Sequence, residues 1–185
     1  MAEPPVPGAR LLVPAARVAR AWTRLAAGLQ PLVDATGCVF IGVMVGGMVP
    51  LVEIARRLSG DFVLDYCQLS RYRDARTGGE LRWISRPQQP LQGRLVVLVD
   101  DIFDEGHTLA ELRRHCLEAG ATRVVAAVLV RKRHDRPVAG PLPEFVGLEV
   151  GDEFVFGCGM DHQGRWRHLP GIYALAGPSA GGAPP

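Results

Sequence analysis

One stretch of the sequence restricts the fold more than any other, namely residues 94–111, which read RLVVLVDDIFDEGHTLAE. A run of five apolar residues, Leu95 to Val99, is followed directly by Asp100 and Asp101. A short, Val-rich run of this kind is typical of a strand that is buried on both faces of a parallel sheet. Two adjacent acids at the end of a buried strand are costly unless they bind something. The sequence therefore predicts a strand that ends in a ligand site.

The residues after this strand predict a loop and the start of a helix. Residues 104–108, DEGHT, form a tight loop, and Thr108 with Glu111 makes a capping-box pattern that places the helix start at Thr108. Apolar residues then recur at helical spacing as far as Gly120, which supplies the stop. A helix start preceded by a glycine-bearing loop offers free N–H groups to an anion. The alternative is an ordinary strand-to-helix turn with two capping acids.

The rest of the chain continues the alternation of strands and helices. This pattern predicts an α/β fold with a mostly parallel sheet and short strands added near the C-terminus. We expect one domain over residues 1–185, with loose tails at 1–9 and 177–185. Helices are predicted over 15–30, ending near Gly28 to Pro31, and after Gly46-Gly47; strands are predicted over 38–45, 62–69, 81–85, 124–130, 145–150, 154–158 and 172–175.

Composition excludes several classes of protein. Hydrophobic residues make up 48% and charged residues 22% of the chain, which is ordinary for a soluble globule. The net charge of +2 is too small to indicate a nucleic-acid partner by itself. The four cysteines are scattered without metal-ligand spacing, which suits a reducing cytosol. No apolar run approaches membrane-spanning length, so we expect a cytoplasmic protein without a membrane partner.

Three further segments are compatible with a ligand-binding role and with a purely structural one. Gly46-Gly47, between a buried strand and a helix, lets the backbone approach a ligand, although such a pair alone is weak evidence. The polar stretch 70–80 is either a lid or a solvated hairpin tip. Lys132 lies beyond the carboxyl end of a predicted strand, where ligands bind in α/β sheets, whereas the arginines at 131, 133 and 136 are predicted to be solvated.

The order VVLV-DD-IF-D-E-G-H-T resembles the ribose-phosphate signature of type I phosphoribosyltransferases. Only Glu105 departs from it, because that position usually holds Ser, Thr, Ala or Arg. From about residue 38 to 176 the chain is similar to the bacterial hypoxanthine-guanine branch of the family. The supporting segments are VGG, RYRDARTGGEL, a lysine just past the next strand, and FVFGCGMDHQGRWR.

The resemblance implies the transfer of ribose 5-phosphate from phosphoribosyl pyrophosphate to hypoxanthine or guanine, with Mg²⁺ as cofactor. Asp104 matches the family's base, which takes or shares the proton of purine N7. Asp100 and Asp101 match the acids that accept from the ribose hydroxyls and face the metal. The donor's 5-phosphate would be held by the loop residues Asp104, Glu105, Gly106, His107 and Thr108, with Glu105 contributing its N–H and His107 no side-chain role.

The same resemblance assigns the remaining site residues. Lys132 matches the donor to the purine 6-oxo group, Phe154 the aromatic that stacks on the base, and Val155 the backbone that pairs with its edge. Pyrophosphate would be bound by Arg167 and by the backbone of Val45, Gly46 and Gly47, since Val45 stands where many members carry Lys. Asp161 would be the third metal carboxylate, and Arg71-Tyr72 would close the lid. Without the family resemblance, Phe154 could equally be a core residue and Asp161 an acid in a turn. Trp166 is better explained by packing than by chemistry.

Two rival functions remain open at this stage. The fold could serve another base, namely adenine, xanthine or orotate, although Lys132 and the aromatic favour a 6-oxopurine. Alternatively, the chain could be a regulator that keeps the phosphoribosyl site and binds RNA or DNA, which would require a broad basic face. We expect no nucleic-acid partner, and a dimer or tetramer as the family forms.

Overall fold

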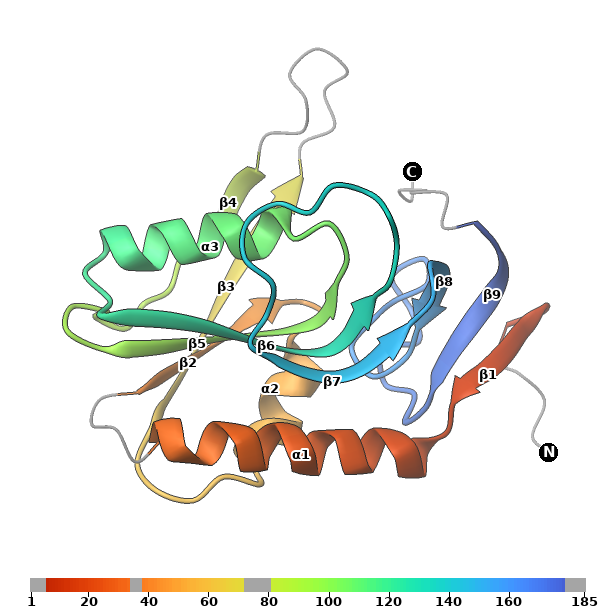
Figure 1. The fold of residues 1–185 in the computed structure, drawn as a ribbon, viewed down its shortest axis with the longest axis horizontal. Helices are drawn as coiled ribbons and strands as arrows, with labels where there is room; N and C mark the ends of the chain where they lie inside the picture. The colour runs from red at the N-terminus through yellow and green to blue at the C-terminus, as the bar shows by residue number, and fades with distance from the viewer. Residues whose placement is uncertain (1–5, 34–37, 72–80, 179–185) are drawn as a thin grey trace, which may run out of the picture.

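The structure is a computed structural model that describes residues 6–33, 38–71 and 81–178. Its centre is a six-stranded sheet in the order β4-β3-β2-β5-β6-β7 (Figure 1). Only β4 runs antiparallel to its neighbour; the other pairings are parallel. The strands are β2 (Val39–Met44), β3 (Val63–Arg71), β4 (Leu81–Ser85), β5 (Leu95–Phe103), β6 (Arg123–Lys132) and β7 (Phe145–Val150). The predicted α/β class is therefore confirmed.

Helices cover both faces of this sheet (Figure 1). The first face packs against α1 (Ala15–Val33) and α2 (Met48–Ala55), the opposite face against α3 (His107–Glu118). The alternation along β5 explains this division, because Val97 and Val99 belong to the core under α1 and α2, whereas Val96 and Leu98 belong to the core under α3. A strand with both faces buried needs the continuous apolar run seen in the sequence.

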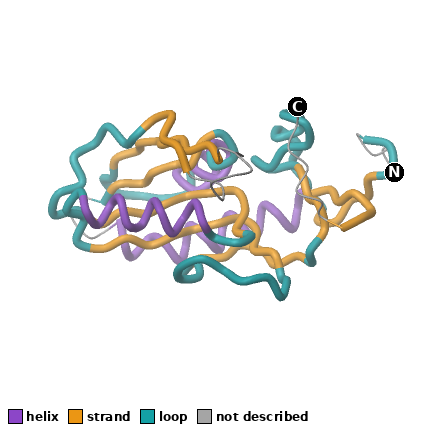
Figure 2. The backbone as a smooth tube through the Cα atoms, turned by 90° about the horizontal axis from the view of Figure 1, so that it is seen from above, coloured by secondary structure: helices purple, strands orange, loops and turns teal. Residues whose placement is uncertain are grey.

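A second, antiparallel sheet lies beside the carboxyl ends of the central strands and forms a hood (Figures 1 and 2). Its order is β1-β9-β8, formed by β1 (Ala9–Val13), β9 (Ile172–Pro178) and β8 (Glu153–Phe156). The sequence placed residues 1–9 in a loose tail and predicted no strand at β1, which is wrong from Ala9 onward. Ala9 is buried and pairs with Leu175 across the hood. Residues 177 and 178, assigned to the other tail, lie in β9.

Three predicted boundaries also need correction. The first helix does not end near Gly28 to Pro31 but continues to Val33, because Leu29 and Val33 extend its buried face. The strand that carries the acids does not stop at Val99 but runs to Phe103, so the acids lie within it. The third helix starts at His107 with Gly106 as its N-cap, and no side chain caps it.

The expected capping box at Thr108 does not form because Glu111 hydrogen-bonds instead to Arg114, 2.6 Å and 3.0 Å away through two oxygen atoms. The stop at Gly120 is confirmed: its φ is +88°, and the N–H of Ala121 returns to the Cys116 carbonyl. All four cysteines are free and buried. Among the described residues, no helix combines the length and the apolar character needed to cross a membrane.

Candidate active site

The predicted site residues gather where the carboxyl ends of β5 and β6 meet the hood. Asp100 and Asp101, called the acid pair below, lie near the end of β5. Burial raises the pKa of Asp100 well above its ordinary value, and the neighbouring charge of Asp101 raises it further. Burial likewise raises the pKa of Asp101. Since burial disfavours an uncompensated carboxylate, this end of the sheet favours a cation or hydroxyl donors.

The Gly46-Gly47 loop packs directly against Asp101 and against the backbone of β5. A Cβ atom on Gly46 would lie 2.1 Å from Asp101 Oδ2, and one on Gly47 would lie 2.5 Å from the Val99 carbonyl oxygen. No side chain fits at either position. The loop follows β2, and its preceding residue Val45 is 43% exposed. The geometry therefore explains both glycines, because the Gly46 backbone lies against the Asp101 carboxylate and the Gly47 backbone lies against the backbone of β5 and β2.

A loop from the hood completes this end of the site. Gly159 packs so closely that a Cβ there would lie 2.4 Å from the Gly46 carbonyl oxygen and 3.0 Å from the Asp101 Cβ. Arg167 crosses the loop, donating to the Gly159 carbonyl at 2.6 Å and pairing with Asp161 Oδ1 at 2.6 Å. Its Nη1 lies 3.9 Å from Asp101 Oδ2. Two segments that are distant in sequence from β5, the Gly46-Gly47 loop and the loop after β8, thus converge on Asp101.

Asp104 lies at the centre of a second group, the Asp104 cluster, which also contains Lys132, His134, Arg136 and Asp152. Lys132 Nζ is 3.2 Å from Asp104 Oδ2, while His134 Nε2 and Arg136 Nη2 are 2.9 Å and 2.7 Å from Oδ1. Burial raises the pKa of Asp104, but the hydrogen bond from Arg136 and the charge of Lys132 outweigh it, so the net shift is downward. Asp104 is therefore ionised at neutral pH.

The loop after Asp104 has the geometry of an anion cradle. Gly106 has φ of +81°, and the first N–H groups of α3, at His107, Thr108 and Leu109, have no partner within the helix because they form its first turn. The carboxylate of Glu105 lies 3.3 Å from Arg136 Nε and 3.7 Å from His107 Nε2. These contacts are compatible with the expectation that Glu105 offers its backbone, not its carboxylate, to a phosphate.

The hood supplies Phe154 and Val155 from β8. The Phe154 ring packs edge-on against His162, with centroids 5.5 Å apart. The Val155 side chain is buried, so a ligand can meet only its backbone. Because β8 is the edge strand of the hood, one side of that backbone is free of strand pairing. A hollow of about 450 Å³ beside Asp104 and Lys132 is also lined by Phe103, His134, Val138 and Leu142.

The two predicted lid residues can be followed only in part. Arg71 is the last residue of β3, where it pairs with Leu81 of β4. Tyr72 and the remainder of the segment to residue 80 lie outside the described residues.

The carboxylates fit a divalent cation in part. Asp100 and Asp101 form a buried acid pair with raised pKa values, but Asp161 is held by Arg167. Among the described residues, no three acidic, histidine or cysteine side chains gather closely enough to hold a metal. Mg²⁺ prefers one or two carboxylates together with water and substrate phosphates. The residues therefore fit an ion that arrives with a phosphorylated ligand better than a resident metal in a protein cage.

The sequence missed three members of the Asp104 cluster. Arg136 was predicted to be solvated, but it hydrogen-bonds to Asp104 and at 2.9 Å to Asp152, while His134 and Asp152 were given no role. A signal was present, because Lys132, His134 and Arg136 alternate as side chains on one face of an extended chain do.

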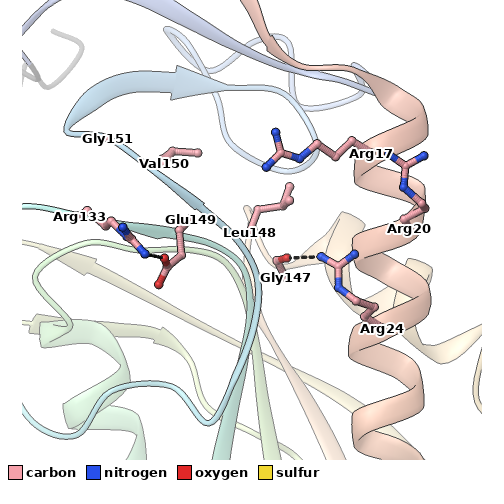
Figure 3. A pocket seen from close by; sticks show the side chains of 9 residues that line it. All are labelled: Arg17, Arg20, Arg24, Arg133, Gly147, Leu148, Glu149, Val150 and Gly151. Carbon is pink, nitrogen blue, oxygen red and sulfur yellow. Dashed lines mark hydrogen bonds and ion pairs between the residues drawn. The ribbon is translucent and has the colours of Figure 1, made fainter.

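A separate hollow of about 690 Å³ lies between α1 and β7 (Figure 3). Arg17, Arg20 and Arg24 line it from the helix, and Arg24 donates to the Gly147 carbonyl at 2.8 Å. Opposite them, Arg133 pairs with Glu149. None of the predicted site residues lines this hollow.

Comparison with known proteins finds a matching family model and several similar proteins. The family model described as a phosphoribosyl transferase domain matches residues 13–163. The hypoxanthine-guanine phosphoribosyltransferase of Bacillus subtilis is 30% identical over 136 residues, covering 73% of this chain and 75% of the relative. The hypoxanthine phosphoribosyltransferase of Escherichia coli K12 is 29% identical over 135 residues, covering 72% and 75%. A crystal structure of a hypoxanthine-guanine phosphoribosyltransferase from Bacillus anthracis superposes with a TM-score of 0.83 at 25% identity, covering 90% of this chain and 98% of that one.

Proposed function

Because this chain belongs to the phosphoribosyltransferase family, we propose that it is a purine salvage enzyme that transfers ribose 5-phosphate from phosphoribosyl pyrophosphate to hypoxanthine or guanine. The products are the corresponding purine nucleotide and pyrophosphate. The choice of base rests on the pairing of Lys132 with Asp104.

This pair matches one edge of a 6-oxopurine. When N9 is the nucleophile, the neutral base carries its imidazole proton on N7, so its edge presents an acceptor at O6 and a donor at N7. Lys132 is a donor without acceptor capacity, and ionised Asp104 is an acceptor without a donor. Their 3.2 Å contact places the two complementary groups next to each other at the end of the sheet. Adenine presents a second donor at its 6-amino group and would leave Lys132 unpaired.

The proposed chemistry needs one bond exchange and one proton transfer. The bond between ribose C1 and the pyrophosphate oxygen breaks as purine N9 bonds to C1, and the N7 proton passes to or is shared with Asp104. The cradle at Gly106 to Thr108 would hold the 5-phosphate, while the acid pair would accept from the ribose hydroxyls and stabilise the cationic sugar. Mg²⁺ would supply charge neutralisation of the leaving pyrophosphate, with Arg167 and the Gly46-Gly47 backbone beside it.

The low pKa of Asp104 limits what this residue does. It is ionised when the base arrives, so it can accept the N7 hydrogen bond at once, but it is a weak base. Its main contribution is therefore electrostatic: it stabilises the N7–H group, which becomes more positive as electron density moves from N9 to ribose C1. Asp104→Asn should lower turnover by ~10²- to 10⁴-fold, the usual range for a general base, with little change in donor affinity. Near-normal turnover would remove Asp104 from this role.

The direct test of the function is a spectrophotometric assay with phosphoribosyl pyrophosphate, Mg²⁺ and each of guanine, hypoxanthine, xanthine and adenine. We expect turnover with guanine and hypoxanthine and almost none with adenine. Turnover of adenine alone would overturn the proposed base choice. An absence of turnover with all four bases, together with salt-sensitive binding of labelled RNA, would support the nucleic-acid-binding regulator instead.

The metal can be tested separately by titration calorimetry. The acid pair and Asp161 face a polyanionic donor with only Arg167 as counter-charge among the contacts described above. We therefore propose that the donor binds with Mg²⁺ and expect its affinity to be weak in a chelating buffer. Equal affinity with and without Mg²⁺ would show that the protein's own cations suffice.

The assembly and location of the chain are also part of the proposal. We propose a single domain that forms a homo-oligomer, a dimer or tetramer, in the cytoplasm, without a nucleic-acid or membrane partner. Exposed apolar side chains support association of copies, and they occur on α2, β3 and β4 at Met48, Val52, Leu64, Tyr66 and Ile84. Sedimentation velocity measures the state directly, and a monomer at micromolar concentration would contradict the oligomer.

A further inference from the structure

We propose that His134 is a positioning residue that anchors one oxygen of Asp104, Oδ1, so that the other, Oδ2, is the atom that meets purine N7. The inference rests on the proposed function, because it names the reacting oxygen of the proposed base. It concerns a residue to which the family signature in this sequence gives no role.

The tautomer of His134 follows from its contacts. The side chain is 4% exposed, and its Nδ1 accepts the backbone N–H of Arg136 at 3.2 Å. A nitrogen that accepts in this way carries no proton, so the neutral ring carries its proton on Nε2. Nε2 faces Asp104 Oδ1 at 2.9 Å. The histidine therefore presents a hydrogen-bond donor to the carboxylate.

The Nε2 donor is poorly satisfied in this arrangement. Although Oδ1 is within hydrogen-bond distance, the N–H direction is not aligned with it, and no other partner for this buried atom occurs among the described residues. A buried donor without a well-formed bond is costly. A turn of the Asp104 carboxylate towards an incoming base would allow the alignment, so that this donor stabilises the bound orientation of Asp104.

The two oxygens of Asp104 have different partners. Oδ1 lies 2.9 Å from His134 Nε2 and 2.7 Å from Arg136 Nη2, whereas Oδ2 lies 3.2 Å from Lys132 Nζ. Lys132 is the group that the proposed chemistry redirects to the purine 6-oxo group. Its departure frees Oδ2 and leaves Oδ1 held. The oxygen available to N7 is therefore Oδ2.

Arg136 cannot hold Oδ1 alone. Its guanidinium also contacts Glu105 at 3.3 Å and Asp152, so it is shared among three carboxylates, and Lys132 lies 3.9 Å from Asp152 as well. These are the charged groups that face Asp104 from its own loop, from the end of β6 and from the turn before β8. His134 Nε2, by contrast, lies 2.9 Å from Asp104 Oδ1, and a small turn of the carboxylate would complete that contact. Its removal should let the carboxylate rotate and should weaken the step that needs a fixed oxygen.

The test compares His134→Phe, which keeps a planar ring and removes the donor, with His134→Gln, whose amide N–H can replace Nε2–H. We expect the Phe variant to lose roughly 10- to 100-fold in kcat, the cost of a misplaced catalytic group, with donor KM changed by less than about two-fold. The acid limb of its kcat/KM profile should move up by about one pH unit, because Asp104 loses a donor to its charged form. The Gln variant should recover most of the wild-type kcat and most of the wild-type pH profile.

Arg133→Met is the matched control, since Arg133 is adjacent, its side chain is 72% exposed and it pairs with Glu149. This variant should keep wild-type kcat and pH profile. A Phe variant with unchanged kcat and profile would overturn the inference, and so would a Gln variant no better than Phe. If the Phe variant fails to fold, the Gln variant is compared with His134→Leu, measured at equal fractions of folded protein, with the same two outcomes.

A measurement without turnover separates this inference from the proposed function. Long-range ¹H–¹⁵N NMR reads the tautomer of each of the five histidines, and His134→Gln assigns the signal. We expect the Nε2–H form for His134. An Nδ1–H form overturns the inference even in an active enzyme. The Nε2–H form in a protein that turns over no purine supports the contact and refutes only the proposed function.

Discussion

Replacing Lys132 with methionine gives the sharpest test of how the site selects its base. The ammonium lies 3.2 Å from Asp104 Oδ2, and the side chain is only 7% exposed. Methionine keeps the length and the apolar stem of lysine and removes the charge. Asp104 keeps its contacts with Arg136 and His134, so the variant does not leave an uncompensated carboxylate and should fold.

The magnitude follows from the hydrogen bond that the purine loses. A bond from a charged donor contributes about 1.5–3 kcal/mol, which corresponds to a loss of roughly 10- to 150-fold in kcat/KM for hypoxanthine. Adenine loses nothing, because its 6-amino group cannot accept from Lys132. Sites built around such a bond reject the wrong partner by ~10⁴-fold. The hypoxanthine-to-adenine ratio should therefore fall at least 10-fold in Lys132→Met, with Lys132→Ala behaving alike.

The assay is the ratio of kcat/KM for hypoxanthine over adenine in wild type, Lys132→Met, Lys132→Ala and Lys132→Gln. The glutamine amide can accept from a 6-amino group, so its ratio should be the lowest. Arg133→Met is again the control, because it removes a neighbouring charge outside the cluster. A wild-type ratio in both the Met and the Ala variants would refute the reasoning and move discrimination to backbone contacts such as those at Val155.

The chain offers an independent readout because Lys132 is its only lysine. An amine-selective reagent can modify only Lys132 and the N-terminus. Modification of Lys132 is measured by peptide mass spectrometry. Hypoxanthine bound with pyrophosphate and Mg²⁺ should protect Lys132 from the reagent, whereas adenine should not. Equal reactivity with and without hypoxanthine would show that the base does not contact the ammonium.

Three further predictions concern the scaffold of the site. The pKa of Asp100 is raised, so its ionisation destabilises the fold as the pH rises. Asp100→Asn should therefore raise the melting temperature at pH 7, by roughly 2–4 °C for each kcal/mol of stability gained. This gain should vanish near pH 4, where the carboxyl group is protonated in the folded protein. Burial raises the pKa of Glu144, but the hydrogen bond from Arg113 outweighs this effect and the net shift is downward. The ionised Glu144 therefore stabilises the fold above the pKa that it has in the unfolded chain, and this stabilisation is lost on acidification. Glu144→Gln should lower the free energy of urea unfolding by about 2 kcal/mol at neutral pH and by much less near pH 3. Gly47→Ala should prevent stable folding or cost several kcal/mol in circular-dichroism melts, because its Cβ would meet a β5 carbonyl at 2.5 Å, whereas Gly151→Ala, which meets nothing within 4 Å, should be neutral.

The sequence predicted the central sheet because that information is local. Each strand of the parallel sheet is a short apolar run. The acid pair, Gly106 and the helix start at His107 all lie within twelve residues of Leu95, where the apolar run before the acids begins. The hood strand β1 was missed because nothing in its five residues distinguishes it from a tail. Its identity depends on pairing with β9, more than 150 residues away, as between Ala9 and Leu175. Contacts so distant leave no periodic signal in a single sequence.

The arrangement of the candidate site could be predicted from the sequence where a motif fixes the backbone, but less well among long side chains. The sequence wrongly grouped Arg136 with the solvated arginines, although it correctly separated Lys132, which is buried, from Arg133, which is exposed. Their difference arises from the strand pleat, which turns alternate residues towards Asp104 or towards solvent. Asp161 was assigned to a metal from the family pattern, whereas its carboxylate meets Arg167 at 2.6 Å. Which partner a flexible carboxylate takes depends on the tertiary structure and on the ligands present.

The two halves of the site differ in how their charges are compensated. The Asp104 cluster contains its own counter-charges, since each of its carboxylates contacts a cation from β6 or the loop after it. Within the part of the chain that the structure describes, the cation near the acid pair is Arg167, and both pKa values of the pair are raised. A neutral purine needs no further charge, and the first half meets it with a preformed donor and acceptor. A polyanionic donor at the second half needs additional positive charge, which a divalent ion travelling with its phosphates would provide. The electrostatics of this chain therefore suit a reaction in which one substrate is neutral and the other arrives as a metal complex.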